Sequence, residues 1–419
     1  MTNIVIVGGG FAGVNAFLEL DKQLHRKAGL DGKAQVTMIS ESDKFLFVPL
    51  IHEVATGTLS PDDVGQPIRQ ITDRCLRFVE AKVESIDLDK QEVMYSRAGF
   101  KETISFDYLV LAAGAQTNFF GVPGAAEHAL SLKNIKDARA LKNRFIDNFV
   151  KAEQASAAEQ QRLLRFVIVG GGPTGVELAG EMSDFFRQLK KAFPRFAAEP
   201  EIVLVEATDR LVCKMEGWFG EQTAGILQRK GNVRVVCGAK VSEITQQSVR
   251  LDYEFIETAC VLWAAGVQAR DVPITAAKIL ERDNKTKRIK VNNYLQVPLY
   301  TNVFVAGDQA WIYDKEEKQP YPMRAQFAVR EGKRAGSNII NILEGKPLSE
   351  FDWNDMGIIV SLGKGGALAK IGNIKVSGFA AWWLYRTAYL FNMVGLRTQL
   401  RTAAEWFINL FLPRDISKL

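Results

Sequence analysis

The sequence has few of the residues that build disulfide frameworks or metal sites. Its 419 residues include four cysteines and three histidines, and the cysteines are widely spaced, with no C-x-x-C pair. This spacing favours reduced, mostly buried thiols in a cytosolic compartment. We therefore expect no bound metal. The residues concerned are Cys75, Cys213, Cys237 and Cys260, together with His25, His52 and His128.

Long apolar runs and low-complexity tracts are also missing. No stretch of about 18 uncharged apolar residues occurs, so we expect no segment that spans a membrane. The first predicted strand begins at Ile4, which leaves no room for a signal or transit peptide. The net charge is only +5, and we expect no nucleic-acid partner. The chain is 47% hydrophobic, as in globular proteins, and its length favours two or three domains.

A glycine-rich motif follows the first apolar run. Ile4–Val7 is predicted to be a strand buried on both faces, and Gly8, Gly10 and Gly13 then form G-x-G-x-x-G before a helical pattern. In such a unit the first glycine permits a tight turn and the second lets a pyrophosphate approach the backbone. The third lets the helix pack closely on the strand. We predict a dinucleotide-binding unit, the alternative being an ordinary glycine turn.

The end of the next predicted strand offers two partners for a ribose. Gln35–Ile39 is predicted to be this strand, and Ser40 and Glu41 follow it. An acidic residue about 20 residues beyond the glycines usually accepts hydrogen bonds from the ribose hydroxyls. Here it comes later because of an insert around residues 25–33. We prefer Glu41, with Ser40 as the rival, and the alternative is a solvated surface glutamate.

The same arrangement occurs a second time. Phe166–Gly175 repeats the strand and the glycine motif, and the strand that follows, Ile202–Val205, ends at Glu206. The distance to this acidic residue exceeds the usual one, and we assign the excess to an inserted amphipathic helix over residues 184–196. Two copies in full context are a stronger indication of dinucleotide binding than either copy alone.

Further apolar segments complete an alternating α/β pattern. Phe106–Gly114 and Cys260–Gly266 are each predicted to be a strand ending in a small-residue turn. Arg77–Ile86 is predicted to be a strand, and Thr301–Asp308 a strand that closes on a Gly-Asp pair. Ala325–Ala335 is predicted to be a helix that starts near Pro322. An aspartate at such a strand end suits a ribityl or phosphate contact, unless it only caps a helix.

These motifs resemble the flavoproteins with two dinucleotide-binding domains, and among them the type II NADH dehydrogenases, which are single-subunit NADH:quinone oxidoreductases. The resemblance is carried by HEVATGTLSP, GGGPTGVELAGE, LVEA, WAAGV, VFVAGDQA, YPMRAQFAVREG and KVSGFAAWWL. It implies an α/β fold with two Rossmann-like domains and a C-terminal amphipathic-helix region that binds membranes. Residues 1–119 and 271–345 would bind FAD, residues 120–270 NADH, and residues 346–419 the membrane.

The resemblance also implies the residues that hold the two cofactors. The first glycine motif, the ribose candidates, the first small-residue turn and the late Gly-Asp pair would hold FAD. One departure is Phe17, which stands where the family has a small residue. The FAD set is Gly8, Gly10, Phe11, Ala12, Gly13, Ser40, Glu41, Pro49, Val83, Ala113, Gly114, Gly307, Asp308 and Ala325; the NADH set is Gly170, Gly172, Thr174, Gly175, Glu206, Ala265 and Gly266.

Three residues are candidates for the reaction itself. The resemblance implies that Glu177 helps to seat the nicotinamide, with Glu181 as a weaker candidate; alternatively, Glu177 complements the helix dipole in the first helical turn. Gln326 matches a quinone motif, where its amide would donate to a quinone oxygen. Lys375 matches a lysine that would stabilise a quinol anion. The alternatives are a helix surface position for Gln326 and a solvated strand charge for Lys375.

The residue types favour NADH as the electron donor and a quinone as the acceptor. Glu206 would accept from both ribose hydroxyls and repel a phosphate, although Arg210 lies near it in the sequence. Residues 41–58 lack the cysteine pair to which disulfide reductases pass electrons, and His52 is predicted to be a core histidine. The alternatives are a soluble NADH:acceptor reductase of the ferredoxin type and a redox scaffold like apoptosis-inducing factor.

Most of the net charge lies near the C-terminus. Residues 375–419 include six basic and two acidic residues and three of the seven tryptophans. Trp and Phe on one side with Arg on another predict helices that lie in an anionic membrane surface. The alternative is a dimer interface or a helix that covers the core. We expect a homodimer bound peripherally to the cytoplasmic face of the bacterial inner membrane, without proton pumping.

Overall fold

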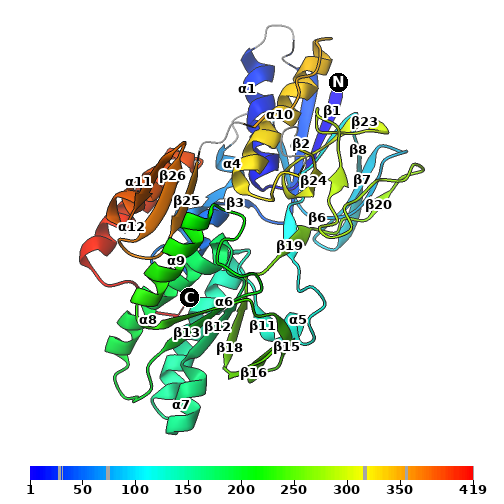
Figure 1. Cartoon of the computed structure of the whole chain (residues 1–419). Helices are drawn as coiled ribbons and strands as arrows, with labels where there is room; N and C mark the ends of the chain where they lie inside the picture. The colour runs from blue at the N-terminus through cyan, green and yellow to red at the C-terminus, as the bar shows by residue number, and fades with distance from the viewer. Residues whose placement is uncertain (27–29, 31, 72–75, 315–318, 354–356, 419) are drawn as a thin grey trace. The chain divides into compact units, whose positions relative to one another are not determined.

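The computed structural model describes residues 1–26, 30, 32–71, 76–314, 319–353 and 357–418 (Figure 1). The chain divides into two compact units, each assembled from three stretches of sequence. The first unit contains Met1–Leu46, Gly65–Gln116 and Val267–Asn354. The second unit contains Phe47–Val64, Thr117–Gly266 and Asp355–Leu419.

A six-stranded sheet in the order β22-β23-β9-β1-β2-β5 forms the centre of the first unit. β1 runs parallel to β2 and to β9, with Val7 opposite both Ile39 and Leu111. Ile4–Val7 is buried, as expected for a central parallel strand covered on both faces. The strands are β1 (Thr2–Val7), β2 (Ala34–Ser40), β5 (Leu76–Glu80), β9 (Tyr108–Leu111), β22 (Gln296–Val297) and β23 (Tyr300–Val305).

Two long helices of this unit, α1 (Phe11–Arg26) and α10 (Ala325–Leu343), lie side by side (Figure 1). Small residues allow the close approach, because a Cβ on Gly332 would overlap the carbonyl of Ala12. Phe17 is completely buried, so the side chain that departs from the family pattern belongs to the core. The predicted helix near Pro322 begins at Ala325 and extends to Leu343.

The predicted strand Arg77–Ile86 is in fact two strands in two sheets. β5 ends at Glu80, and β6 (Lys82–Asp87) joins a mixed sheet in the order β20-β6-β7-β8, in which β6 is parallel to β20 and antiparallel to β7. The chain turns at Ala81, whose N–H donates to the Ser40 carbonyl at 2.9 Å. The other strands of this sheet are β7 (Glu92–Arg97), β8 (Phe100–Ser105) and β20 (Ile274–Thr275).

The second unit has a five-stranded parallel sheet in the order β11-β18-β12-β13-β14. α8 (Pro173–Ala192) follows β12 as a single helix of 20 residues, so the predicted separate helix over residues 184–196 is wrong. The motif helix is simply long, because apolar residues continue its buried face through Leu189. The strands are β11 (Ala129–Leu130), β12 (Arg165–Val169), β13 (Glu201–Glu206), β14 (Val233–Cys237) and β18 (Cys260–Trp263).

The C-terminal stretch folds onto the second unit. α11 (Phe379–Asn392) packs on a sheet of three antiparallel strands, and α12 (Leu396–Phe411) packs on α3 (Pro61–Val64). None of the helices within the described residues is long and apolar enough to cross a membrane. The three strands are β25 (Ile358–Ser361), β26 (Ala367–Ile371) and β27 (Ile374–Ser377).

The remaining elements complete the two units. Those of the first unit are β3 (Lys44–Leu46), β4 (Gly65–Pro67), α4 (Ile68–Ile71), β19 (Val267–Ala269), β21 (Ile289–Lys290), η2 (Gly307–Gln309) and β24 (Ala310–Trp311). Those of the second unit are η1 (Val48–Leu50), α2 (Ile51–Ala55), α5 (Ala125–His128), α6 (Ile135–Ala152), α7 (Ala157–Leu163), α9 (Gly217–Arg229), β15 (Val241–Ile244), β16 (Ser248–Leu251) and β17 (Phe255–Glu257), and β10 (Ala115–Thr117) spans the change from one unit to the other.

The compact units differ from the expected domains in two respects. Residues 47–64, expected in the FAD domain, belong to the second unit, where α2 packs on α6 and α8. Most of the expected membrane region, from Asp355 onward, is also part of the second unit. The changes of unit at 116/117 and 266/267 fall within four residues of the expected boundaries.

Candidate functional site

The first glycine loop lies between β1 and α1 and has the shape of a phosphate-binding turn. Gly8 has a φ of +108°, and a Cβ there would overlap the carbonyl of Ala112. A Cβ on Gly13 would overlap the carbonyl of Gly8, whereas the space outside Gly10 is open. The first turn of α1 contains no acidic residue. A pyrophosphate can therefore reach the loop backbone and the helix N-terminus.

The Gly-Asp pair lies against this loop, as the predicted FAD set requires. Gly307 has a φ of +69°, and a Cβ there would lie 3.0 Å from the Cβ of Ala12. Gly114 accepts a hydrogen bond from the Gln309 side chain at 2.7 Å. These contacts bring the loop, the turn after β9 and η2 together within the first unit. The residues fit an ADP-containing cofactor such as FAD.

Glu331 is a residue of this region that the sequence did not single out. It is 3% exposed and accepts a hydrogen bond from the Gly307 N–H at 2.6 Å. Burial raises the pKa of its carboxyl to about 8. The feature of the sequence that could have identified Glu331 is a glutamate on the apolar face of α10, one turn after Phe327. A protonated Glu331 therefore holds the Gly-Asp turn without carrying a negative charge.

Ser40, rather than Glu41, lies against the first glycine loop. Ser40 is the residue after Ile39, which pairs with Val7, and its Oγ lies beneath Gly9. Glu41 is exposed and forms an ion pair with Arg270 at 3.0 Å. The geometry therefore favours the rival that the sequence ranked second.

Two members of the predicted FAD set lie on other elements. Pro49 is in η1, which belongs to the second unit, and Val83 is in β6, opposite Tyr95 of β7. Ala325 begins α10, and Phe11 begins α1, where its ring contacts Phe45 edge-on. The positions of Asp308 and Ala113 follow directly from their neighbours Gly307 and Gly114.

The second glycine loop, between β12 and α8, repeats the geometry of the first. Gly170 has a φ of +112°, and a Cβ there would lie 2.6 Å from the Cα of Ala265. A Cβ on Gly175 would overlap the carbonyl of Gly170, whereas the space outside Gly172 is open. Thr174 lies in the first turn of α8, after Pro173. The NADH set is thus brought together within one unit, and Gly266 closes it beside the ring of Phe120.

Glu206 ends β13 next to this loop, at the ribose position of the second unit. It follows Val205, which pairs with Val169. Its Oε2 accepts from the Gly171 N–H at 2.7 Å, and its Oε1 accepts from the Thr208 N–H at 2.8 Å. The carboxylate is therefore held at the edge of the loop, where the hydroxyls of an adenosine ribose would arrive.

Glu177 lies one turn deeper in α8 than expected. The helix begins at Pro173 and has no acidic residue in its first turn, so complementation of the helix dipole there is not its role. Its Oε1 accepts from the Ser361 N–H at 3.3 Å. Burial, which outweighs this hydrogen bond, raises the pKa of Glu177 to about 8, with help from Glu53 and Glu181. Glu177 is therefore a neutral carboxylic acid at pH 7.

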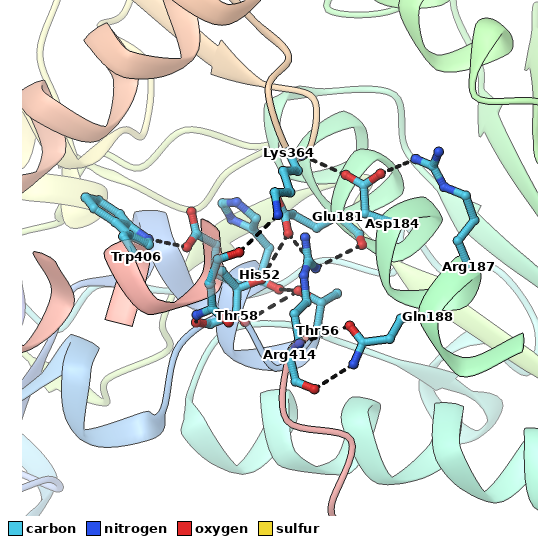
Figure 2. Close-up of polar contacts among 12 residues, drawn as sticks. His52, Thr56, Thr58, Glu181, Asp184, Arg187, Gln188, Lys364, Trp406 and Arg414 are labelled. Atoms are coloured by element: carbon cyan, nitrogen blue, oxygen red, sulfur yellow. Dashed lines mark hydrogen bonds and ion pairs between the residues drawn. The ribbon is translucent and has the colours of Figure 1, made fainter. Parts of the chain in front are cut away.

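Glu177 interacts electrostatically with Glu53 and Glu181, which belong to a buried charged cluster. Figure 2 shows Glu181 of this cluster together with His52 of α2 and with Trp406 and Arg414 of the C-terminal segment. Glu53 accepts from Trp406 Nε1 at 2.7 Å, and burial together with Glu181 raises its pKa to about 7. Glu181 accepts from the Thr58 hydroxyl at 3.2 Å and pairs with Arg414 at 2.8 Å. Burial opposes ionisation of Glu181, but Arg414 and the other nearby cations lower its pKa. Glu181 therefore carries the negative charge of the cluster.

His52 is buried beside this cluster, as the sequence predicted for a core histidine. It is 2% exposed, and burial lowers its pKa to about 4, so the ring is neutral at pH 7. Its Nε2 has no hydrogen-bond partner among the described residues. The sequence did not predict that Glu53, Arg414 and Trp406 lie near Glu181, because they are more than a hundred residues from it in the chain.

Two of the three C-terminal tryptophans are internal, which corrects part of the predicted membrane surface. Trp382 and Trp406 are buried, and the Arg386 guanidinium lies 3.8 and 4.9 Å from their ring centres. Trp383 is 48% exposed, and further exposed side chains form an apolar surface on α11 and α12. These are Phe379, Phe391, Leu396, Leu400, Phe407, Ile408 and Phe411, with Leu412 just beyond.

Most of the six basic residues within residues 375–419 are paired within the chain. Arg414 pairs with Glu181, and Arg401 lies 3.5 Å from Asp63. Lys418 pairs with Asp147, and Arg386 is stacked between the two tryptophans. The excess positive charge seen in the sequence is therefore largely neutralised in the fold.

The two residues predicted to contact a quinone lie in different units. Gln326 is in the first turn of α10, and its side-chain amide has no hydrogen-bond partner among the described residues. Lys375 is in β27 of the second unit, where it pairs with Glu216 at 3.0 Å and lies over the Trp218 ring. Lys375 is therefore positioned by a carboxylate rather than only solvated.

The described cysteines are free thiols. Cys260 is buried in β18, and burial raises its pKa to about 12, which makes it unreactive. Cys213 and Cys237 are partly buried. Cys75 lies outside the described residues.

Comparison with known proteins identifies close similarities over nearly the whole chain. The sequence model of the pyridine nucleotide-disulphide oxidoreductases matches residues 2–332. The type II NADH:quinone oxidoreductase Ndh of Mycobacterium tuberculosis is 32% identical, over 98% of this chain and 88% of that protein. The type II NADH:quinone oxidoreductase of Staphylococcus saprophyticus is 28% identical, over 94% and 96%.

The fold is also that of solved structures. NDH2 from Plasmodium falciparum in complex with NADH superposes with a TM-score of 0.91, covering all of both chains at 19% identity. The sulfide:quinone oxidoreductase of Aquifex aeolicus superposes with a TM-score of 0.74, also at 19% identity, over 98% of this chain and 96% of that chain.

Proposed function

The chain belongs to the type II NADH:quinone oxidoreductases, within the pyridine nucleotide-disulphide oxidoreductase family, and we propose that it oxidises NADH and reduces a quinone to quinol, using FAD. The observation that carries this function is the pair of glycine loops in one chain, with Glu206 beside the second loop and an uncharged residue beside the first. Residues 41–58 contain no cysteine that could receive the electrons. The overall reaction is NADH + H⁺ + quinone → NAD⁺ + quinol.

FAD supplies the two-electron chemistry, because a flavin accepts a hydride and then reduces a second substrate. The first unit binds its pyrophosphate at the Gly8–Gly13 loop and its adenosine ribose near Ser40. The second unit binds NADH at the Gly170–Gly175 loop, with the ribose hydroxyls on Glu206. Glu177 seats the nicotinamide and, as a neutral acid, holds a proton at its carboxyl group.

We propose quinone-contacting roles for residues at the start of α10, in the first unit, and separately for Lys375 of β27, in the second unit. The small side chains of Ala325 and Ala328 leave room for a flat ring, and the Gln326 amide donates to one quinone oxygen. Lys375, held by Glu216, stabilises the negative charge that develops on the reduced ring. Loss of quinone turnover in Gln326→Ala, with reduction of the flavin by NADH unchanged, is the expected result.

Membrane attachment uses the apolar surface of α11 and α12 rather than the basic residues. The exposed rings of Trp383, Phe391, Phe407 and Phe411 enter the interface of the membrane in which the quinone is dissolved. We place the protein on the cytoplasmic face of a bacterial membrane, as a homodimer. Because most basic residues within 375–419 are paired inside the chain, we expect only a small preference for anionic lipid.

The function is tested by steady-state NADH oxidation with FAD-loaded protein. A soluble short-chain quinone is compared with ferricyanide and with oxygen as acceptor. Fast turnover with the quinone is expected. Fast flavin reduction with slow transfer to every quinone would instead favour a protein acceptor, as in a ferredoxin-type reductase. Slow turnover with a long-lived reduced complex would favour a redox scaffold.

The membrane assignment is tested by vesicle flotation of Phe407→Ser/Phe411→Ser. Both side chains are exposed, so the fold is retained, and vesicle affinity should fall at least about tenfold. Phe100→Ser, which removes an exposed phenylalanine from the first unit, is the matched control. Unchanged flotation of the double variant would contradict this surface, and sedimentation of the wild type measures the oligomeric state.

A further inference from the structure

The Glu206 carboxylate is held by three hydrogen bonds from its own unit. Oε2 accepts from the Gly171 N–H at 2.7 Å. Oε1 accepts from both the N–H and the hydroxyl of Thr208, at 2.8 and 2.9 Å. A carboxylate has about four acceptor positions, so only one remains, and it is on Oε2. The orientation of Glu206 is thus fixed. The two hydroxyls of a ribose need two acceptor positions, and Glu206 has only one left.

The Thr208 hydroxyl can supply the missing acceptor position. It has a single proton and two acceptors within reach, Glu206 Oε1 at 2.9 Å and the Arg210 carbonyl at 3.0 Å. While its proton stays on Glu206 Oε1, the Thr208 oxygen keeps lone pairs that can accept one ribose hydroxyl. Oε2 accepts the other hydroxyl, and the hydrogen bond from the Thr208 side chain keeps the carboxylate in place.

Arg210, which the sequence left as a possible phosphate ligand, is directed elsewhere. Its Nη2 donates to the Cys213 carbonyl at 3.2 Å. Its side chain runs past Gly217 and Gly220 at the start of α9, where the missing side chains leave room for it. Without this arrangement its guanidinium would be the natural partner of a 2′-phosphate.

We propose that Thr208 is a positioning residue that sets the selectivity for NADH over NADPH through Glu206, and that Arg210 is withheld from the 2′ position by the Cys213 carbonyl. This inference rests on the proposed function, because it assumes that a dinucleotide ribose binds at Glu206. Thr208 keeps the carboxylate facing the ribose. A 2′-phosphate there meets a fixed negative charge with no cation to compensate it.

The test measures binding without redox chemistry. FAD-containing protein, in which the first loop is already filled, is titrated calorimetrically with ADP-ribose and with 2′-phospho-ADP-ribose. The wild type should bind ADP-ribose at least about 100-fold more tightly. Thr208→Val removes the hydroxyl but keeps the size and the backbone N–H, and should lower this ratio about fivefold. Thr208→Ser should restore it to within about twofold.

Two further variants separate the roles. Arg210→Ala should change the ratio less than about twofold, because the guanidinium does not face the site. Thr245→Val, at an exposed turn of the same unit, controls for the loss of a threonine hydroxyl elsewhere. The inference would be overturned by an unchanged ratio of the two affinities in Thr208→Val, or by a loss of 2′-phospho-ADP-ribose binding in Arg210→Ala. Either result would leave the proposed NADH site intact. A wild type that binds neither ligand would overturn the NADH site as well.

Discussion

The two glycine loops of this chain have the same backbone geometry, but they differ in the side chains that lie beside them. In both, the first glycine has a φ above +100°, and a side chain on the third would overlap the carbonyl of the first. In register, Ser40 of the first unit corresponds to Glu206 of the second, and Asn15 of α1 to Glu177 of α8. Backbone geometry therefore specifies a dinucleotide in general. The side chains at these two positions specify which one, and whether a titratable group lies nearby.

The strongest test of this comparison is the third glycine of each loop. Gly13→Ala should abolish the retention of FAD. Gly175→Ala should still bind FAD, but the rate at which NADH reduces the flavin should fall at least about 100-fold. In each case the new Cβ overlaps a carbonyl oxygen that cannot move without opening the loop. Flavin absorbance and stopped-flow reduction measure the two effects. Gly366→Ala, at a glycine of the second unit that has no positive φ and no atom closer than 3.7 Å to the added Cβ, is the control for the methyl group itself.

The next largest effect concerns the acidic residue that only the second loop has. Glu206→Ala should lower the ratio of kcat/KM for NADH over NADPH at least about tenfold, because the ribose loses its acceptor and a 2′-phosphate loses its repulsion. Steady-state kinetics with both dinucleotides measure this ratio. If the ratio stays at the wild-type value, the ribose does not bind at Glu206.

The buried acid of α8 should make stability depend on pH in a way that α1 does not. The pKa of Glu177 rises from 4.5 to about 8 on folding, so the folded chain binds the extra proton, and stability falls as pH rises between these values. Glu177→Gln should therefore stabilise by on the order of 2 kcal/mol at pH 8.5 and by little at pH 5. Thermal unfolding at both pH values measures the difference.

The converse substitution sharpens this test. Asn15 is buried in α1 and donates to the Phe11 carbonyl at 2.8 Å. Asn15→Asp removes that donor and introduces a buried acid at the corresponding position, so it should destabilise more at pH 8.5 than at pH 5. If either variant changes the free energy of unfolding equally at the two pH values, the side chain at that position is exposed to water rather than buried.

The smallest effect distinguishes Ser40 from Glu41. Ser40→Ala should raise the Kd for FAD about threefold to fivefold, because one neutral hydrogen bond is lost. Glu41→Gln should change it less than about twofold, because the exposed ion pair with Arg270 contributes little. Fluorescence titration of the apoprotein with FAD gives both constants. The opposite order would restore Glu41 as the ribose partner.

Local sequence patterns predict much of the site. The loops, the small-residue turns and the residues after each strand were found because strand, glycine motif and helix are contiguous in the chain. The long α8 was divided wrongly, since residues 184–196 look like a separate amphipathic helix until they are seen to continue one buried face. The strand at residues 77–86 was merged wrongly, since the turn at Ala81 depends on a hydrogen bond to Ser40.

The sequence by itself determined the fold class, the two dinucleotide loops and the apolar character of the C-terminal helices, because these depend on short-range spacing and on side-chain type. Only the tertiary structure decided that Ser40 faces the first loop, that Arg386 lies between Trp382 and Trp406, and that Arg414 neutralises Glu181. Such pairings join residues far apart in the chain. They exist because a charge removed from water needs a partner, wherever in the sequence that partner lies.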